Sequence, residues 1–455
     1  MKLRNRSNSV DMLHGPLLKK ILLFSLPLVL SGMLQQLFNS ADIAVVGRFA
    51  GSAAQAAVGC NTSVVALMLG LFTGLSVGAN AEIAACIGRE DDRAIDDAVH
   101  TVILLAFLSG IFMLFLGLFI ARPLLRLMNT PDDVLQQAVL YLRVYMLGAP
   151  FIILYNFGAA ILRSKGDTAR PTAALIIAGV INLGLNLVFV IVFHMGVAGV
   201  AVATTISNLF SGTVILILLL REEGPFRLSL NRLRLVKQPL VQVVRIGVPA
   251  GIQTMVFSLS NVCIQSAVNS LGSVIVAGSA DGVTFEMYSY YLISGFVQTT
   301  VTFTGQNYAA GHYDRCRRIL WLCMASSAVS TLAAGLTLYA LRIPFMHLFT
   351  TDEAVIAAAI VRFKHVLILQ FIANSYEISA SALRGIGVAL PPAIISILGT
   401  CLLRILWVYT VFPHVRSFAF LLYIYPISWV VTGCSMLTAL ALAWKKNMPR
   451  QKELT

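Results

Sequence analysis

The stretch LRSKGDTARP, Leu162–Pro171, occurs twice in this chain and decides how the chain is organised. It returns at Leu383–Pro392 as LRGIGVALPP, with Leu, Arg, Gly and Pro in the same slots 221 positions on. Gly166 and Gly387 each supply a chain reversal, and the prolines that follow begin a new helix, where a missing N–H group costs nothing. The stretch therefore predicts a joint between two helices that is present once in each half of the chain.

Three further residue pairs repeat in the same order at nearly the same offset. Pro27 pairs with Pro249 and Asn39 with Asn261 at an offset of 222, and Gly88 pairs with Gly311 at 223. Four matches at a nearly fixed offset indicate a duplicated half of roughly 220 residues.

The composition is typical of a membrane protein. The chain is 58% hydrophobic and only 12% charged, with a mean hydropathy of +0.83. A span needs about 20 apolar residues, and long, nearly uncharged stretches recur throughout. We therefore predict an all-α integral membrane protein with 12 transmembrane helices in two six-helix bundles. Because six spans bring each half in with the same orientation, the bundles are expected to be related by a pseudo-two-fold axis along the membrane normal.

This plan divides the chain into an N-terminal bundle (1–220), a cytoplasmic linker (221–239) and a C-terminal bundle (240–455). The first span is expected at 21–46, the second at 54–87 and the third at 99–121, with a charged turn at 88–98. A fourth span ends near Leu162, and outer loops are expected at 121–133 and 342–353.

The net charge of +13 is a topology signal in this plan, not a nucleic-acid footprint. Of the 33 Lys and Arg residues, 24 fall at the termini and in every second loop, all on one side. Because cytoplasmic loops carry an excess of Lys and Arg, both termini are expected in the cytoplasm.

Acidic residues inside the spans are the strongest functional signal. Asp42, Glu286 and Glu377 fall well inside apolar stretches, whereas Glu82 and Asp281 lie near span ends. A charged side chain at the bilayer centre costs at least ~2.5–3.5 kcal/mol, so such residues usually face a cavity or a partner.

In the first half, Gln35, Asn39 and Asp42 form one polar stripe with spacing i, i+4 and i+7. Asn182 and Asn186 share a face of the fifth span. The amides could simply hydrogen-bond across helices as packing contacts. A packing contact does not need a carboxylate, so we interpret Asp42 as functional.

In the second half, Glu286 is followed one turn later by Tyr290. A second stripe contains Gln370, Asn374, Glu377 and Ser381. Glu286 is interpreted as lining a cavity, while for Glu377 a structural role is equally consistent with the pattern. The intramembrane cation Arg404 is a candidate partner for either acid.

Sequence motifs give no support to an enzyme. GLSVG at 74–78 matches the nucleophile motif G-x-S-x-G, but that motif needs a strand, a turn and a helix, and this copy lies in a long apolar stretch. Gly70, Gly74 and Gly78 fit better as a small-residue face for close helix packing. The sequence contains no P-loop and no H-E-x-x-H motif, and its seven His are scattered. No catalytic residues and no structural metal site are therefore predicted.

Four stretches together resemble the MATE (multidrug and toxic compound extrusion) family over roughly residues 15–445. They are SLPLVLSGMLQQLFNSADIAVVG in the first span, LRSKGDTARP after the fourth, INLGLNLVF in the fifth and TGQNYAAGHYDR after the eighth. The resemblance implies a secondary antiporter in which H⁺ or Na⁺ enters while an amphipathic, often cationic, compound leaves. It also implies the inner membrane of a prokaryote, small-molecule substrates and lipids as partners, and a monomer with no cofactor beyond the coupling ion.

Family members use an acid in the first span for coupling, which falls on Asp42 here. Its implied neighbours are Asn156, Asn182 and Asn186. Many members carry Asp where this chain has Asn186, so its first-half site has one ionisable group fewer. Some members also carry an acid in the seventh span, where this chain offers Ser258, Asn261 and Gln265.

A substrate cavity is expected between the two bundles. Its predicted lining residues are Gln35, Asn39, Asn261, Gln265, Glu286, Tyr290 and Glu377. Glu286 matches an acidic position that many bacterial members have in the eighth span.

The preferred function is thus an efflux antiporter that works by rocking two bundles between inward-open and outward-open states. The alternative is a flippase for lipid-linked precursors with the same broader fold. That rival needs a strongly cationic cavity for a pyrophosphate, whereas the intramembrane charges in this sequence are mainly acidic. A membrane-embedded enzyme and a non-transporting scaffold are further rivals with less support.

Overall fold

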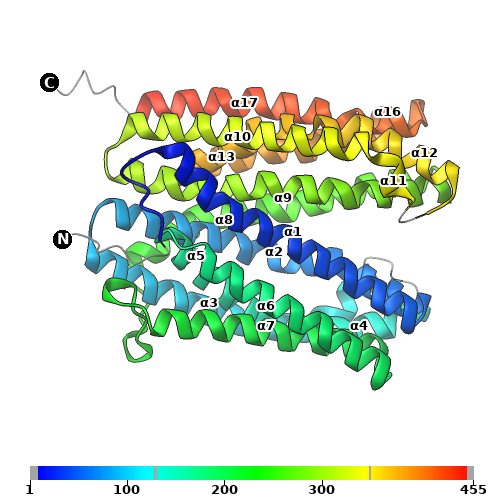
Figure 1. Ribbon diagram of the computed structural model, residues 1–455, viewed down its shortest axis with the longest axis horizontal. Helices are drawn as coiled ribbons and strands as arrows, with labels where there is room; N and C mark the ends of the chain where they lie inside the picture. The colour runs from blue at the N-terminus through cyan, green and yellow to red at the C-terminus, as the bar shows by residue number, and fades with distance from the viewer. Residues whose placement is uncertain (1–8, 128–129, 131, 348–349, 448–455) are drawn as a thin grey trace. The chain divides into compact units, whose positions relative to one another are not determined.

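The computed structural model describes residues 9–127, 130, 132–347 and 350–447, and within them the regular structure is entirely helical (Figure 1). These residues form two compact units. The first contains Leu30–Gly251 together with the described residues before Met12, and the second contains Met12–Val29 and the described chain from Ile252 onward. The unit boundaries fall inside two helices, so the predicted division at residues 221–239 stays a prediction.

Long helices make up the first unit. They are α1 (Leu17–Phe49, from Leu30), α2 (Ser52–Gly88), α3 (Asp92–Leu127), α4 (Asp132–Leu147), α5 (Ala149–Ser164), α6 (Ala169–Leu187) and α7 (Gly196–Leu220). A π-helical turn, η1 (Val188–Val192), continues α6, and two 3-10 turns, η2 (Gly224–Phe226) and η3 (Leu230–Arg232), precede α8 (Lys237–Asn269). A core of wholly buried side chains such as Ile103, Leu142 and Phe157 joins α3, α4 and α5.

The second unit has the same plan but more interrupted helices. After the second part of α8 come α9 (Ser273–Ala309), α10 (Tyr313–Ala340), α11 (Arg342–Met346) and α12 (Glu353–Arg362). The turns η4 (Phe363–Leu367) and η5 (Ile368–Ala373) lead from α12 into α13 (Asn374–Gly385). The last spans are α14 (Leu390–Ser396), η6 (Ile397–Leu402), α15 (Leu403–Leu406), η7 (Trp407–Val411) and η8 (Phe412–His414), then α16 (Phe418–Leu422) and α17 (Ile424–Asn447).

Ten helical segments of the described chain are long and apolar enough to cross a membrane, or 11 when the bent pair α4–α5 counts as one span. Helix α9, which is rich in serine, threonine and tyrosine, is as long as any of them and completes the predicted set of twelve. The chain is thus an all-α integral membrane protein with six spans in each half.

The repeated joint forms as predicted. Gly166 and Gly387 have φ angles of 102° and 82°, in the left-handed region that favours glycine. Pro171 and Pro392 lie in the first turn of α6 and α14. A Cβ atom on Gly166 would also lie 2.4 Å from the carbonyl oxygen of Val10, so the first joint has no room for a side chain.

The predicted fourth span is formed by the bent pair α4–α5, whose two helices meet at an angle of 47°. Gly148 lies at the break, and Pro150 follows in the first turn of α5. A proline within a helix removes one backbone hydrogen bond and displaces the preceding turn, which accounts for the bend.

Several helices also extend beyond the predicted spans. Helix α3 begins at Asp92, because the Asp91 carboxylate accepts a hydrogen bond from the backbone N–H of Ala94 at 2.9 Å and caps the helix. It continues to Leu127, so the outer loop expected at 121–133 begins later. Residues 128, 129 and 131 of that loop lie outside the described chain. Part of the second outer loop forms the short helix α11.

The glycine face of α2 is confirmed at two of its three positions. A Cβ atom on Gly74 would lie 2.1 Å from the backbone nitrogen of Gly251, and one on Gly78 would lie 2.3 Å from the carbonyl oxygen of Val243. Both contacts are with the part of α8 that belongs to the first unit. The GLSVG segment therefore lies within a helix and does not have the strand–turn–helix geometry of a nucleophile elbow.

Candidate cation site and the polar residues of the spans

Asp42, Asn182 and Asn186 come together inside the first unit. Asn186 donates a hydrogen bond from Nδ2 to Asp42 Oδ1. When the Asn182 amide is oriented so that both its ends have partners, its Nδ2 donates to Asp42 Oδ1 at 2.8 Å. All three side chains are buried. The carboxylate thus accepts two amide hydrogen bonds.

Helix geometry explains why the two asparagines share this site. Residues four apart on α6 lie on the same face, which meets α1 at Asp42. Thr204 on α7 supports Asn182 from the far side, with Oγ1 3.2 Å and the backbone nitrogen 3.3 Å from the amide oxygen in the same orientation.

Tyrosines on α4 complete the surroundings of Asp42. Tyr141 and Tyr145, also four residues apart, stack with ring centroids 6.0 Å apart, and both lie within the electrostatic influence of Asp42. Neither tyrosine nor Thr204 is among the site residues predicted from the sequence. The i, i+4 spacing of the tyrosines in a half-polar span is the signal that could have found them.

The Asp42 carboxylate has only neutral partners in the described part of the chain. No Lys, Arg or His nitrogen there lies within 4 Å of it, and the buried Oδ1 of Asn186 accepts no hydrogen bond. A buried charge with neutral partners only is costly. A proton, or a small metal cation that prefers carboxylate and amide oxygens, would neutralise it.

Three other residues predicted for the cation site or the substrate cavity do not reach this cluster. Gln35 and Asn39 lie on α1 with exposed side chains. Asn156 lies on α5, half-buried, and among the described residues no hydrogen bond joins it to Asp42. Their predicted roles stay predictions.

In the second unit, Glu286 on α9 forms a buried ion pair with Arg362 at the end of α12. Arg362 Nε lies 2.7 Å from Oε1 and Nη2 lies 2.8 Å from Oε2, a two-fold contact that matches the flat guanidinium to the carboxylate. Arg362 also donates to Ser279 Oγ at 3.0 Å and to the Tyr425 hydroxyl at 3.3 Å. A cationic substrate would have to displace Arg362 to use Glu286 as its counter-charge.

Arg404 is buried but forms no ion pair with either predicted acid among the described residues. Its guanidinium lies over the rings of Tyr425, at 4.5 Å, and Phe257, at 5.4 Å, and its Nε donates to Ser428 Oγ at 3.2 Å. Arg362, and not the predicted candidate Arg404, is the ion-pair partner of Glu286. An arginine within the apolar run of α12 was the available signal.

The remaining predicted residues of the second half are spread over three helices. Glu377 on α13 is half-buried and interacts with Tyr376 and with the charge of Arg384. Tyr290 on α9 is close enough to Glu377 for the two side chains to interact electrostatically. Asn261 and Gln265 are exposed on α8.

The second unit also buries three arginines, of which the sequence analysis placed only Arg404 within the membrane as a candidate partner. They are Arg362, Arg384 and Arg404; the acids of the same spans are Glu286, which is buried, and Glu377, which is half-buried. Arg362 is close to Glu286, and Arg384 is close to Glu377. Arg384 also donates a hydrogen bond to Gln253 Oε1 at 2.7 Å.

Comparison with known proteins gives the family. The MatE family model matches residues 27–188 and again 249–410, so the two matched segments begin at the paired residues Pro27 and Pro249. The probable multidrug resistance protein YoeA of Bacillus subtilis (strain 168) is 28% identical over 385 residues, 82% of each chain. The probable multidrug resistance protein NorM of Thermotoga maritima is 26% identical over 387 residues, 83% of this chain and 82% of that one.

Solved structures show the same fold. A structure described as the outward-facing conformation of a multidrug resistance MATE family transporter of the MOP superfamily superposes with a TM-score of 0.91 at 22% identity, covering 98% of this chain and 100% of that one. The twelve spans, the duplicated halves and the double match of the family model lead to one conclusion: the chain belongs to the MatE (multidrug and toxic compound extrusion) family of multi-pass membrane transporters.

Proposed function

We propose that this protein is a cation-coupled antiporter that exports amphipathic, cationic compounds by alternating access, with H⁺ or Na⁺ as the coupling ion. The Asp42 cluster is the observation that carries the proposal. It holds an acid inside a span, with two amide donors and no cationic partner among the described residues. A buried carboxylate without a cationic partner is costly, and a bound small cation removes that cost.

Coupling requires that cation and substrate each favour a different conformation, so that each changes the other's affinity. Asp42 and Asn186 lie on different helices, α1 and α6. A change in the packing of these helices would therefore open or close the cluster and alter its affinity for the cation.

The names of the relatives support the substrate class. YoeA and NorM are named as probable multidrug resistance proteins, which suggests several chemically related substrates. We infer the cytoplasmic (inner) membrane of a prokaryote from the bacterial relatives. Both termini are proposed to lie in the cytoplasm, on the basis of the Lys and Arg distribution.

Transport into proteoliposomes tests this proposal. Purified protein would be reconstituted, and the movement of fluorescent organic cations followed under an imposed pH gradient and, separately, an imposed Na⁺ gradient. The gradient that drives transport identifies the coupling ion. Asp42→Asn keeps the shape of the site but cannot take up a proton, so we expect normal insertion and loss of gradient-driven transport.

A matched control is Asp314→Asn, an acid-to-amide change at an exposed residue at the start of α10. It should leave transport unchanged. Equal gradient-driven transport by Asp42→Asn and wild-type protein, at matched protein amounts, would show that coupling runs through another residue.

The flippase alternative gains one observation, the buried arginines of the second unit. Arg362 is neutralised by Glu286 and Arg384 is close to Glu377, which leaves Arg404 as the surplus cation. A pyrophosphate carries several negative charges, and one surplus arginine cannot neutralise them, so this observation gives the flippase little support. Movement of a labelled lipid pyrophosphate, with no movement of organic cations, would decide for the flippase.

A further inference from the structure

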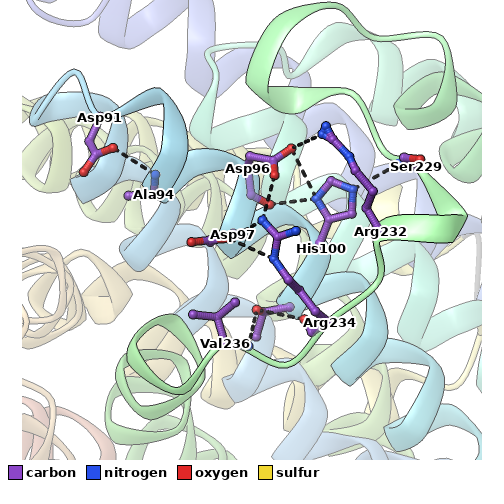
Figure 2. A network of polar contacts seen from close by, with 10 residues as sticks. Asp91, Ala94, Asp96, Asp97, His100, Ser229, Arg232, Arg234 and Val236 are labelled. Atoms are coloured by element: carbon purple, nitrogen blue, oxygen red, sulfur yellow. Dashed lines mark hydrogen bonds and ion pairs between the residues drawn. The ribbon is translucent and has the colours of Figure 1, made fainter.

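The segment between the two halves is attached to the start of α3 by an extended polar network (Figure 2). Residues 229–236 of the linker lie against Asp96, His100 and Thr101, and all these residues belong to the first unit. The predicted function makes no use of this network. We call residues 229–236 the latch segment.

His100 makes two contacts that together fix its chemical state. Its Nδ1 lies 2.8 Å from the carbonyl oxygen of Asp96, one helical turn back, and its Nε2 lies 3.1 Å from the backbone nitrogen of Ser229. A backbone N–H group can only donate, so Nε2 must carry the lone pair that accepts it. The proton is therefore on Nδ1, where it is donated to the Asp96 carbonyl, and the ring is neutral.

The imidazole is completely buried, so water cannot take over either contact. Protonation of Nε2 would place an N–H group against the N–H group of Ser229. Two N–H groups cannot hydrogen-bond to each other, so the bond would be lost and both buried N–H groups would have no acceptor. The hydrogen bond from Ser229 to His100 therefore forms only when His100 is neutral.

The charged groups around the ring come from both sides of this interface. Asp96 Oδ1 lies 3.5 Å from His100 Nδ1 and would favour a charged ring. However, Asp96 is shared with Arg232, at 3.6 Å, and Arg234, at 3.1 Å, and Arg234 also binds Asp97. The charged groups nearest the ring are therefore two arginines and two aspartates, whose formal charges cancel.

The other end of the latch segment has contacts that do not depend on His100. Thr101 Oγ1 accepts a hydrogen bond from the backbone N–H of Val236 at 3.1 Å and donates to the carbonyl oxygen of Arg234 at 3.2 Å. Helix α8 begins at the next residue, Lys237. The attachment therefore sets where α8 starts, and α8 has residues in both compact units.

We propose that residues 229–236 form a pH-sensitive latch, held on α3 by neutral His100 and released at its Ser229 end when His100 is protonated. Acidification of the solution around the linker is the trigger, because an added proton on Nε2 removes the acceptor that Ser229 uses. Release loosens residues 229–233, which then keep only the exposed ion pair of Arg232 with Asp96, whereas the Thr101 contacts keep residues 234–236 attached. The proposal concerns the linker alone and does not depend on which ion or substrate is transported.

Hydrogen–deuterium exchange of the full-length protein in lipid nanodiscs tests the latch. Exchange would be measured at pH 7.5 and 5.5 and corrected for the intrinsic pH dependence of amide exchange. For wild-type protein we expect residues 229–233 to exchange at least about fivefold faster at pH 5.5, the population change that corresponds to one ordinary hydrogen bond. Residues 374–385 of α13, in the other unit, serve as the internal reference and should not change.

Variants of His100 separate the latch from a general acid effect. His100→Gln keeps an acceptor near the position of Nε2 and cannot be protonated, so its latch segment should be protected equally at both pH values. His100→Leu removes the acceptor and should exchange quickly at both. His194→Gln changes an exposed histidine in the turn between η1 and α7, and should behave as wild-type protein.

Two results would overturn the proposal. One is equal protection of residues 229–233 in wild-type protein at both pH values. The other is a pH response that persists in His100→Gln, which would assign the response to another group. If His100→Leu fails to fold, the comparison of His100→Gln with wild-type protein still decides the question.

Discussion

Arg362 and Glu286 are joined by two parallel hydrogen bonds, at 2.7 and 2.8 Å, in a buried part of the second unit. Removal of one partner from such a pair leaves a buried charge without compensation and costs about 3–5 kcal/mol. We therefore expect Arg362→Met to lower the melting temperature of the purified protein strongly. The additional change Glu286→Gln should restore much of the loss, because it removes the uncompensated charge.

The control for this pair is Arg317→Ala, which breaks the exposed ion pair between Arg317 and Asp314, 3.3 Å long. Exposed pairs contribute about 0–1 kcal/mol, so the melting temperature should change little. A loss for Arg362→Met no larger than for this control would mean that Glu286 has another partner in the membrane.

Asn186→Asp adds a second carboxylate beside Asp42, since the present amide donates directly to that side chain. Two neighbouring acids bind a cation more tightly than one, because each charge lowers the energy of the bound ion. We expect the concentration of Na⁺ that protects the protein from thermal unfolding to fall by about tenfold or more. Asn208→Asp, an amide on α7, is the comparison variant.

An unchanged Na⁺ response in Asn186→Asp would argue that the cluster binds protons only. A stronger response in Asn208→Asp than in Asn186→Asp would move the cation site away from Asp42.

The sequence predicts those contacts that a local pattern specifies. Gly166 and Gly387 recur at fixed positions, and both adopt the left-handed backbone that the turn requires. Four-residue spacing places Asn182 and Asn186 on one face of a helix, and the resemblance to the MATE family implied that this face lies beside Asp42. The structure brings these three residues together.

Contacts chosen by packing between distant helices could not be predicted in the same way. Arg362 lies where α12 passes into η4, and only the packing of α9 against α12 shows that it, and not Arg404, binds Glu286. Thr204 lies on α7, and only the packing of α6 against α7 shows that it contacts Asn182. His100 meets Ser229 across 129 positions of chain.

Glu222 gives a prediction about pH at the other end of the linker. Burial raises the pKa of this carboxyl, but the hydrogen bonds and charges of Lys165 and Arg170 outweigh burial, and the pKa of Glu222 falls below its ordinary value of 4.5. A group whose pKa is lowered by folding contributes stability above its unfolded pKa and loses it as the pH falls through the folded value. The contact should therefore hold at pH 7.5 and 5.5 and weaken only below about 4.5.

Glu222→Gln should imitate the low-pH state at neutral pH. We expect faster amide exchange in residues 163–170 and 222–226, measured at pH 7 by hydrogen–deuterium exchange. Glu223→Gln, at the exposed neighbouring residue, should have a smaller effect. A loss of protection at pH 5.5 in both Glu222→Gln and wild-type protein would contradict this assignment and point to His100.

The close approach of α2 and α8 is tested by a single methyl group. A Cβ atom on Gly78 would lie 2.3 Å from the Val243 carbonyl oxygen and 2.9 Å from the Gly247 nitrogen, and both are backbone atoms that cannot rotate away. Gly78→Ala must therefore push the helices apart, at a cost of about 1–3 kcal/mol. Gly59→Ala on the same helix has no atom within 4 Å of its new Cβ and should leave the melting temperature unchanged or slightly higher. Because both variants gain the same helix propensity, the difference between their melting temperatures measures the contact alone, and equal values would show that α2 and α8 are not packed this closely in the membrane.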